Sequence, residues 1–289
     1  MLAKKYKTPL RYMGGKSRAT KTLLNFLPNV MIGKYVEPFV GGGSMAFAFS
    51  RQFPHVPIHI NDKYYNLYCF WITLRDRPSD LVNRLLSVKS EAHDAVGHRK
   101  LFDDCKDYLT KIDCGQPWNN TFEIGWRWWV CNKCSFSGLG ESSGFSEQAS
   151  VSNFSESNIR ALLEYGAHIK DWKITNHDYS DCLIDDPGTF IYLDPPYAKV
   201  GKDGNSFLYG RNGDMHKHFD HTEFHTQVSF CQAPMMISYD NNKLLKEMYS
   251  DWEQHTFDLT YTLHSGKNYR ADEKNRKELL LMNYGSILS

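Results

Sequence analysis

A four-residue turn after an apolar strand is the strongest chemical signal in the sequence. The turn Asp194-Pro195-Pro196-Tyr197 follows directly on the apolar run 190–193. Its two prolines fix φ and donate no N–H, so the turn is stiff. A stiff turn can aim the carboxylate of Asp194 and the carbonyl oxygen of Pro195 at one amino group, while Tyr197 offers a flat face for stacking. An ordinary proline turn with an N-capping aspartate is the alternative interpretation.

Two hydrogen-bond acceptors aimed at one amine predict a specific chemistry. The amino nitrogen of adenine is a poor nucleophile because its lone pair is delocalised into the ring. Acceptors that hold both of its hydrogens favour the tetrahedral nitrogen that attacks. If the methyl donor is a sulfonium, positioning and electrostatics supply most of the catalysis and no metal is required. A base inside a duplex reaches such a pocket only after it has flipped out of the helix.

A glycine turn earlier in the chain predicts the binding site of a nucleotide-like cofactor. Residues 35–44, Tyr-Val-Glu-Pro-Phe-Val-Gly-Gly-Gly-Ser, read as a strand, a glycine turn (Gly41 to Gly43) and the start of a helix. Glycines let the backbone approach a ligand closely, and a helix N-terminus offers free N–H groups. Asp62 ends the next predicted strand, where a carboxylate can accept hydrogen bonds from both ribose hydroxyls of an adenosine. A plain tight turn, and a helix N-cap at Asp62, are the alternatives.

Strands that alternate with helices position both turns. We expect a helix at 44–53 and strands at 34–40, 56–61, 173–176, 190–193, 235–239, 255–263 and 279–283. This alternation predicts an α/β fold with a mainly parallel, doubly wound sheet, which binds ligands beyond the carboxyl ends of its strands. Residues 78–170 break the alternation with polar helical patterns and a Trp-, Ser- and Gly-rich stretch. We therefore expect a catalytic domain at 1–77 and 171–289, and an inserted, mostly helical domain at 78–170.

The composition allows an ordinary globular core. Hydrophobic residues are 41%, charged residues are 23%, and the formal net charge of +1 indicates no particular partner. Basic residues are concentrated in the segment 1–36, which has no Asp or Glu. This arm either meets phosphate or forms a solvated helix face. No apolar run reaches about 18 residues, so no membrane span is expected.

The cysteines indicate a reducing compartment. Seven cysteines occur without a signal peptide, which favours the cytoplasm of a bacterial or phage-infected cell. Cys131 and Cys134 form a Cys-x-x-Cys pair, but Cys105 and Cys114 do not form a second compact pair. Because a structural zinc site needs about four ligands, free buried thiols are favoured over zinc.

With both turns placed, the sequence resembles the DNA adenine methyltransferase (Dam) family, the α-group or D12 class of N6-adenine enzymes. The order of motifs is the family's: an N-terminal cofactor segment, the glycine turn, a recognition insert and the Asp-Pro-Pro-Tyr turn. The resemblance implies a Rossmann-like, seven-stranded methyltransferase sheet with an antiparallel final strand and an inserted helical target-recognition domain. It implies methyl transfer from S-adenosylmethionine to the N6 amino group of adenine in double-stranded DNA, in a restriction–modification or phage setting. No obligate protein partner is expected.

The resemblance also assigns residues to the cofactor and to catalysis. In the segment 10–16, Leu-Arg-Tyr-Met-Gly-Gly-Lys, Tyr12 and Lys16 correspond to cofactor contacts, although Tyr12 also suits a core position and Lys16 a surface charge. Asp178 resembles the residue that meets the cofactor's adenine, and Asp194 resembles the catalytic aspartate. The expected cofactor-binding residues are Tyr12, Gly14, Lys16, Glu37, Pro38, Phe39, Gly41, Gly43, Ser44, Asp62, Asp178 and Asp194. The expected catalytic residues are Asp194, Pro195, Pro196 and Tyr197.

The insert carries the expected DNA contacts. Residues 132–139, Asn-Lys-Cys-Ser-Phe-Ser-Gly-Leu, are similar to the family's Asn-Arg-x-x-Tyr/Phe-Asn-Gly-Leu run, which borders the DNA. Lysine at 133 reads guanine less selectively than the usual arginine, so GATC or a relaxed specificity is expected. The candidate DNA contacts are Arg127, Asn132, Lys133, Lys199 and Lys217, with plain surface charge as the alternative. We expect Trp126, Trp128 and Trp129 to lie in the core rather than to stack on bases.

Three rival functions use related pockets. An N4-cytosine methyltransferase more often has serine at the first position of the turn, and Asp194 therefore favours adenine. A protein or RNA amino-methyltransferase more often has asparagine there and has no need for the insert. A DNA-binding protein that has lost turnover is the non-enzymatic alternative. The joint presence of Tyr12, Lys16, Asp62, Asp194 and Tyr197 argues against it.

Overall fold

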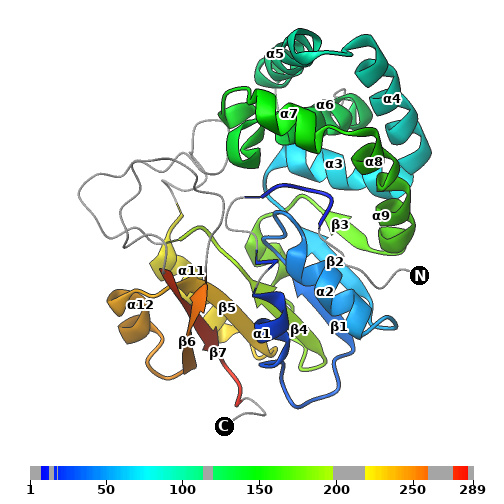
Figure 1. The fold of residues 1–289 in the computed structure, drawn as a ribbon. Helices are drawn as coiled ribbons and strands as arrows, with labels where there is room; N and C mark the ends of the chain where they lie inside the picture. Colours follow the sequence, from blue (N-terminus) through cyan, green and yellow to red (C-terminus); the bar gives the residue numbers. More distant parts are fainter. Residues whose placement is uncertain are drawn as a thin grey trace.

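The computed structural model describes residues 8–12, 16–17, 19–112, 120–197, 219–259 and 276–285, and these residues contain one seven-stranded sheet (Figure 1). The strands are β1 (Lys34–Glu37), β2 (Ile58–Asn61), β3 (Lys173–Thr175), β4 (Thr189–Leu193), β5 (Met235–Asp240), β6 (Glu253–Leu259) and β7 (Arg276–Met282). Each overlaps a predicted strand. β1 ends before Pro38, which cannot donate to the hydrogen-bond ladder. β7 starts earlier than predicted because it pairs with β6 as far as Arg276.

The strand order is β3-β2-β1-β4-β5-β7-β6. Neighbouring strands are parallel from β3 to β5, whereas β7 lies antiparallel between β5 and β6. This confirms the predicted Rossmann-like sheet with an antiparallel final strand. The chain order reverses between β1 and β4, and doubly wound sheets bind ligands at such a switch point, beyond the carboxyl ends of the strands.

Side chains of the central strands alternate between two apolar layers, one on each face of the sheet. Tyr35, Phe190 and Tyr192 pack in the layer that includes helices 20–24 and 44–52 and the helices of the middle segment. Val36 and Ile191 pack in the layer that includes helices 221–230 and 243–248. A strand covered on both faces is buried along its length, as β4 is at every residue.

Two groups of helices surround this sheet in Figure 1. Those beside the sheet are α1 (Thr20–Leu24), α2 (Ser44–Gln52), α11 (His221–Phe230) and α12 (Lys243–Met248). Those of the upper lobe are α3 (Tyr65–Asp76), α4 (Pro78–Glu91), α5 (Ala95–Lys111), α6 (Thr121–Cys134), α7 (Glu147–Asn153), α8 (Glu156–Arg160) and α9 (Leu162–Ile169). Short 3₁₀ helices are η1 (Phe136–Gly138), η2 (Gly140–Ser142) and η3 (Tyr179–Cys182). Several lobe helices begin at side-chain caps, among them Asp94 of α5 and Asn120 of α6.

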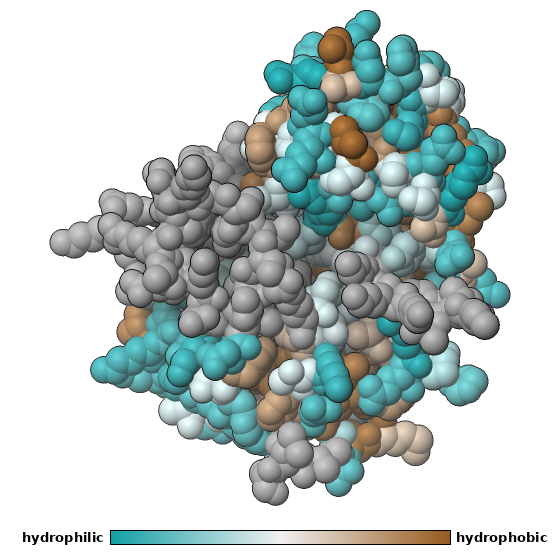
Figure 2. Space-filling model, in the orientation of Figure 1, coloured by the Kyte–Doolittle hydropathy of each residue, from teal (hydrophilic) through white to brown (hydrophobic). Residues whose placement is uncertain are grey.

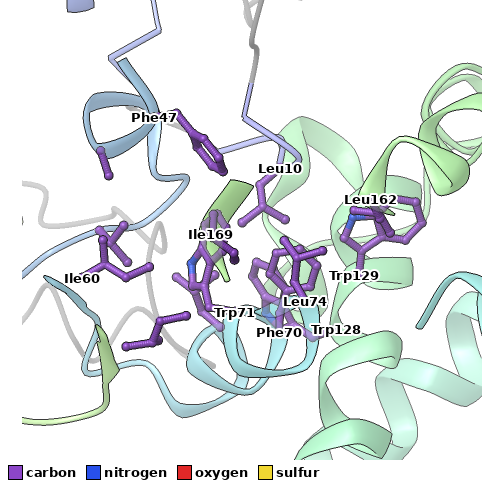
Figure 3. Close-up of a cluster of buried hydrophobic side chains, with 14 of the residues drawn as sticks. Leu10, Phe47, Ile60, Phe70, Trp71, Leu74, Trp128, Trp129, Leu162 and Ile169 are labelled. Atoms are coloured by element: carbon purple, nitrogen blue, oxygen red, sulfur yellow. The ribbon is translucent and has the colours of Figure 1, made fainter. Parts of the chain in front are cut away.

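The helix α3 joins the upper lobe to the sheet. Trp71 and Leu74 of α3 are fully buried, and they belong to one apolar cluster with Ile60 of β2 and Trp129 of α6. Figure 3 shows members of this cluster, from Phe47 and Ile60 beside the sheet to Trp129 and Leu162 in the lobe. Trp126, Trp128 and Trp129 are all buried, which confirms that they are core residues. The domain boundaries at 77/78 and 170/171 stay a prediction, because buried contacts cross both.

Some predicted features fall outside the described residues. They are Gly14, Lys199, Lys217 and the last residues of the predicted strand 255–263. Among the residues that are described, no helix combines the length and the apolar character needed to cross a bilayer. Where the described residues are coloured in Figure 2, the upper lobe is mostly hydrophilic with a few apolar spots, and further apolar side chains show among hydrophilic ones in the lower part.

The crossing of α3 and α6 gives a prediction for stability. A Cβ at Gly125 of α6 would lie 2.6 Å from Thr73 Oγ1 and 2.8 Å from the carbonyl oxygen of Cys69, both in α3. Helix propensity alone makes Gly125→Ala stabilising. We expect the opposite sign, a loss of about 1–3 kcal/mol in the free energy of unfolding, because the helices must separate. Denaturant unfolding measures this, with Gly144→Ala as the uncrowded control. A Gly125→Ala protein as stable as the parent would contradict the close crossing.

Candidate active site

The two predicted turns open into one cavity beyond the carboxyl ends of β1 and β4. Its volume is about 660 Å³ including the open mouth, a size typical of small-molecule sites. The predicted residues that line it are Tyr12, Lys16, Glu37, Phe39, Gly41, Gly43, Ser44, Asp62, Asp194 and Pro196. Residues from the N-terminal segment, the glycine turn, the end of β2 and the Asp194–Tyr197 turn, which we call the elbow, therefore meet in one place.

The glycine turn requires its glycines for conformation and for space. Gly41 and Gly43 have φ of 46° and 71°, in the left-handed region that other residues rarely adopt. A Cβ at Gly41 would also lie 2.7 Å from a ring carbon of Tyr12. Gly43 caps the N-terminus of α2, so the first N–H groups of that helix face the cavity end of the sheet.

Asp62 ties the glycine turn to the end of β2. Its Oδ2 accepts a hydrogen bond from the Gly41 N–H at 2.9 Å, and its Oδ1 accepts one from the Tyr64 N–H at 2.9 Å. Burial raises the pKa of Asp62 to about 7, and the hydrogen bond from Gly41 offsets this only in part. Each carboxylate oxygen has two lone pairs, so both oxygens can still accept a hydrogen bond from a ligand in the cavity.

At the elbow, one carboxylate oxygen of Asp194 is fixed by contacts with Ser238 and Lys16. Oδ1 accepts a hydrogen bond from Ser238 Oγ at 2.9 Å and lies 3.1 Å from Lys16 Nζ. Because Ser238 gives its one hydrogen to Asp194, Tyr192, whose hydroxyl is 2.9 Å away, must donate to Ser238. These contacts orient the carboxylate. Burial raises the pKa of Asp194, whereas Lys16 opposes that rise.

The ammonium of Lys16 lies beneath the elbow. Its side chain is 2% exposed, it donates to the hydroxyl of Tyr197, and it lies 3.5 Å from Oε2 of Glu278 in β7. Tyr197 in turn donates to the same oxygen of Glu278 at 2.8 Å. The predicted cofactor residue Lys16 and the predicted catalytic residue Tyr197 are thus parts of one charged cluster.

Glu37 is a second buried carboxyl group in the cavity wall. It is 3% exposed, and its Oε2 accepts a hydrogen bond from the Tyr35 hydroxyl at 2.7 Å. Burial raises the pKa of Glu37 well above its usual range, and the hydrogen bond from Tyr35 counteracts the rise only in part. A cationic group placed beside Glu37 would favour its ionised form.

Among the described residues, four of those predicted for the cofactor or for catalysis do not line the cavity: Pro38, Asp178, Pro195 and Tyr197. Pro38 lies between β1 and the glycine turn, and Pro195 lies within the elbow. Asp178 forms an ion pair with Lys63 at 2.7 Å, and it caps η3 through the Ser180 N–H at 3.2 Å. The predicted contact between Asp178 and the cofactor's adenine therefore stays a prediction.

The predicted DNA contact Arg127 points into the lobe. Its side chain is 17% exposed and forms an ion pair with Glu123 of the same helix. The guanidinium lies 4.0 Å from the ring centre of Tyr108 and 4.2 Å from that of Trp126. These contacts match a structural role, because the charge of Arg127 is already paired with Glu123 and its guanidinium is already in contact with aromatic rings.

Asn132 and Lys133 are also turned inward. Asn132 is fully buried, and its amide accepts from the Arg11 N–H at 3.1 Å and donates to the Arg11 carbonyl at 2.7 Å and to that of Gly138 at 2.8 Å. Lys133 is 7% exposed, and burial lowers its pKa to about 7. DNA contact by these residues stays a prediction that their burial does not support. Asn132 instead holds the segment that carries Tyr12 into the cavity.

Sequence reasoning missed two residues that touch the elbow, Glu278 and Ser238. Glu278 is 1% exposed and Ser238 fully buried. The available signal was position: Glu278 is a carboxylate next to the apolar run 279–282, and Ser238 is a small polar residue within the apolar strand β5. A polar side chain inside a buried strand needs a partner, which marks both as candidates.

Known proteins place the chain in a family. The model of the D12 class N6 adenine-specific DNA methyltransferases matches residues 12–265. Type II methyltransferase M.MjaIII of Methanocaldococcus jannaschii is 24% identical over 218 residues, which are 69% of this chain and 72% of that protein. Type II methyltransferase M.CviBI of Paramecium bursaria Chlorella virus NC1A is 21% identical over 284 residues, 95% of this chain and 98% of that protein.

A solved structure adds little to this. A Listeria monocytogenes protein assigned to the class I S-adenosylmethionine-dependent methyltransferases aligns with 99% of this chain and 65% of its own, at 9% identity and a TM-score of 0.39, too distant a likeness to support an inference. The family model does support one, because it extends from the N-terminal segment through the insert and beyond the elbow. The chain belongs to the D12 class of N6 adenine-specific DNA methyltransferases.

Proposed function

We propose that the cavity binds S-adenosylmethionine along the glycine turn, and that Asp194 and Pro195 hold the N6 amino group of an adenine flipped out of double-stranded DNA. One observation carries the proposal: the glycine turn and the carboxylate of Asp194 line the same cavity. A donor on the turn therefore lies within reach of an amine at the elbow. S-adenosylmethionine, the donor that membership of this family implies, supplies a methyl group on a positively charged sulfur when it is bound.

The residues around the glycine turn fit that donor. Asp62 has lone pairs for two ribose hydroxyls, and its pKa of about 7 means that donated hydrogen bonds would be needed to keep it ionised near neutral pH. Glu37, whose pKa burial also raises, suits the ammonium of the donor's methionine part. The ring of Tyr12 lies directly over Gly41 and can close one side of the site.

The elbow fits the amine. Because Oδ1 of Asp194 is held by Ser238 and Lys16, Oδ2 is the oxygen left to face a substrate hydrogen. The side chain of Asp194 is 22% exposed, so the cavity reaches it. During transfer the methyl carbon–sulfur bond breaks, sulfur keeps the electron pair, and the new bond forms from N6. N6 then loses a proton, for which Asp194 is the nearest acceptor. The anchored hydroxyl of Tyr197 fixes its ring for stacking on the base.

The upper lobe is the candidate for reading DNA sequence. Family membership makes DNA the substrate, and a base must leave the duplex to enter a cavity of this kind. The candidate contacts Lys199 and Lys217 follow the elbow in the chain, where cations suit the phosphates beside a flipped nucleotide. We keep GATC or a relaxed site as the proposed specificity.

Loss of the elbow carboxylate tests the proposed catalysis. We expect Asp194→Ala to lower the single-turnover methylation rate on unmethylated DNA by roughly 10³-fold, on the scale of losing a charge-stabilising group. Binding of S-adenosylmethionine should weaken but stay measurable by calorimetry. Asp171→Ala removes a carboxylate that is 86% exposed and serves as the control. Full activity in Asp194→Ala would exclude the role given to this residue.

The cofactor side makes a prediction about pH. If the ionised form of Asp62 accepts the ribose hydroxyls, affinity for S-adenosylmethionine should fall as the pH drops below about 7, by up to tenfold per unit. Asp62→Asn should weaken binding by about 1–3 kcal/mol and remove this pH dependence. Calorimetric titrations from roughly 1.5 pH units below to roughly 1.5 units above the pKa of Asp62 measure both effects. An Asp62→Asn protein with the parent's affinity and pH profile would remove Asp62 from the cofactor site.

The substrate and its specificity need a direct measurement. Unmethylated genomic DNA is incubated with the protein and labelled donor, and modified bases are mapped by single-molecule sequencing. We expect N6-methyladenine within a short recurring sequence. Methylated cytosine, or label transferred only to RNA or protein, would replace the proposed function with one of its rivals.

A further inference from the structure

A carboxylate behind the elbow has no role in the chemistry described so far. Glu278 lies in β7, opposite Asp240 of β5, and is 1% exposed. Its Oε2 accepts a hydrogen bond from the Tyr197 hydroxyl at 2.8 Å and lies 3.5 Å from Lys16 Nζ. Lys16 is in turn 3.1 Å from Asp194. Three segments that are remote in the chain thus meet around one ammonium.

The hydrogens of this cluster can be assigned. The hydroxyl of Tyr197 has one hydrogen, which it gives to Glu278, so it accepts a hydrogen bond from Lys16. Lys16 also points at Oδ1 of Asp194. Glu278 therefore holds both ends of the elbow, because it binds Tyr197 directly and reaches Asp194 through Lys16.

Among the described residues, two carboxylates share one ammonium in this cluster. Asp194 and Glu278 both face Lys16. Placing charges in a buried site is costly, and an ammonium with one carboxylate partner would already be neutral as a pair. Lys16 is thus divided between the carboxylate of the elbow and the carboxylate behind it.

An ammonium that is shared between two carboxylates suits the transfer. The reaction moves a positive charge from the sulfur of the donor to N6 of the base, and both atoms would lie beside Asp194. If Lys16 were paired with Asp194 alone, it would cancel most of the charge that stabilises N6. A second carboxylate shares the ammonium, so that Asp194 keeps more of its charge for the amine.

We propose that Glu278 is a positioning residue for methyl transfer: it anchors Tyr197 and shares Lys16, and it thereby keeps Asp194 oriented toward the substrate amine. This inference rests on the proposed function of the cavity. It assigns Lys16 to the support of the elbow, through Asp194 and Tyr197.

The test uses variants of the full chain with matched changes. Glu278→Gln removes the charge but keeps the size and an oxygen for Tyr197. Glu278→Asp keeps the charge on a shorter side chain. Asp258→Asn, an exposed carboxylate on the adjacent strand β6, is the control. Each protein is assayed for single-turnover methylation of unmethylated DNA, for affinity toward S-adenosylmethionine and for thermal unfolding.

We expect Glu278→Gln to slow single-turnover methylation by about 100-fold. Its affinity for S-adenosylmethionine should stay within about threefold, because Asp62, Glu37 and the glycine turn are unchanged. It should unfold at the parent's temperature or above, since one ammonium and one carboxylate remain as a balanced pair. Glu278→Asp should recover part of the rate. The double variant Glu278→Gln/Tyr197→Phe should methylate only slightly more slowly than the slower of the two single variants, because the two residues act as a unit.

The pH–rate profile separates this role from a structural one. Burial raises the pKa of Asp194, and Glu278 raises it further against the effect of Lys16. The groups that face Asp194 electrostatically are Lys16, Glu278, Glu37, Tyr192 and Tyr239. Transfer needs ionised Asp194, so the rate falls on the acid side. Removing the charge of Glu278 should move this acid limb to lower pH and lower the plateau rate. A loss of folded protein would instead lower the rate by the same factor at every pH.

Two results would overturn the inference. One is a Glu278→Gln protein whose single-turnover rate is within about twofold of the parent's. The other is a loss of rate that tracks a loss of cofactor affinity or of thermal stability, with the acid limb unmoved. Either result, obtained with a parent protein that methylates DNA adenine, removes the role of Glu278 alone. A parent protein that transfers no methyl group to DNA would instead remove the proposed function.

Discussion

The lateral pairing of β1 with β4 is the constraint on which the site depends. Tyr35 pairs with Phe190 and Val36 with Ile191 in a parallel register. Because the strands run in the same direction, the glycine turn after β1 and the elbow after β4 leave the sheet at the same edge. The residues between them in the chain can then include a whole lobe of helices without separating the two turns. Buried apolar side chains on both faces hold this pair of strands in place.

The cavity is rich in carboxyl groups that burial makes hard to ionise. Burial raises the pKa values of Glu37, Asp62 and Asp194, which come from three different strand ends. Such a site gains most from a ligand that brings positive charge and hydroxyl hydrogens. A sulfonium carrying an amino acid and a ribose has both, so the electrostatics of the protein and the identity of the family point to the same donor.

The antiparallel last strand was implied by the family resemblance, whereas local patterns were sufficient to predict the strands, the glycine turn and the elbow. They succeed because each rests on neighbouring residues: a buried strand reads as an apolar run, and glycines or prolines mark the turn that follows. Glu278 escaped prediction because its partners Lys16 and Tyr197 are brought to it only by the completed sheet. The burial of Lys133 was not predicted for a related reason, since no local pattern shows that the lobe covers its side chain.

The bridge between Asn132 and Arg11 has an evolutionary consequence. The side-chain amide of Asn132 takes the place of a neighbouring strand for the backbone of Arg11, and Gly138 leaves no room for a side chain against the same residue. The next residue along the chain is Tyr12, which lies on the glycine turn. A mutation at position 132 or 138 would therefore also disturb the cavity. If the upper lobe reads DNA as proposed, changes of target sequence within this family should avoid these two positions and occur in the exposed parts of the lobe.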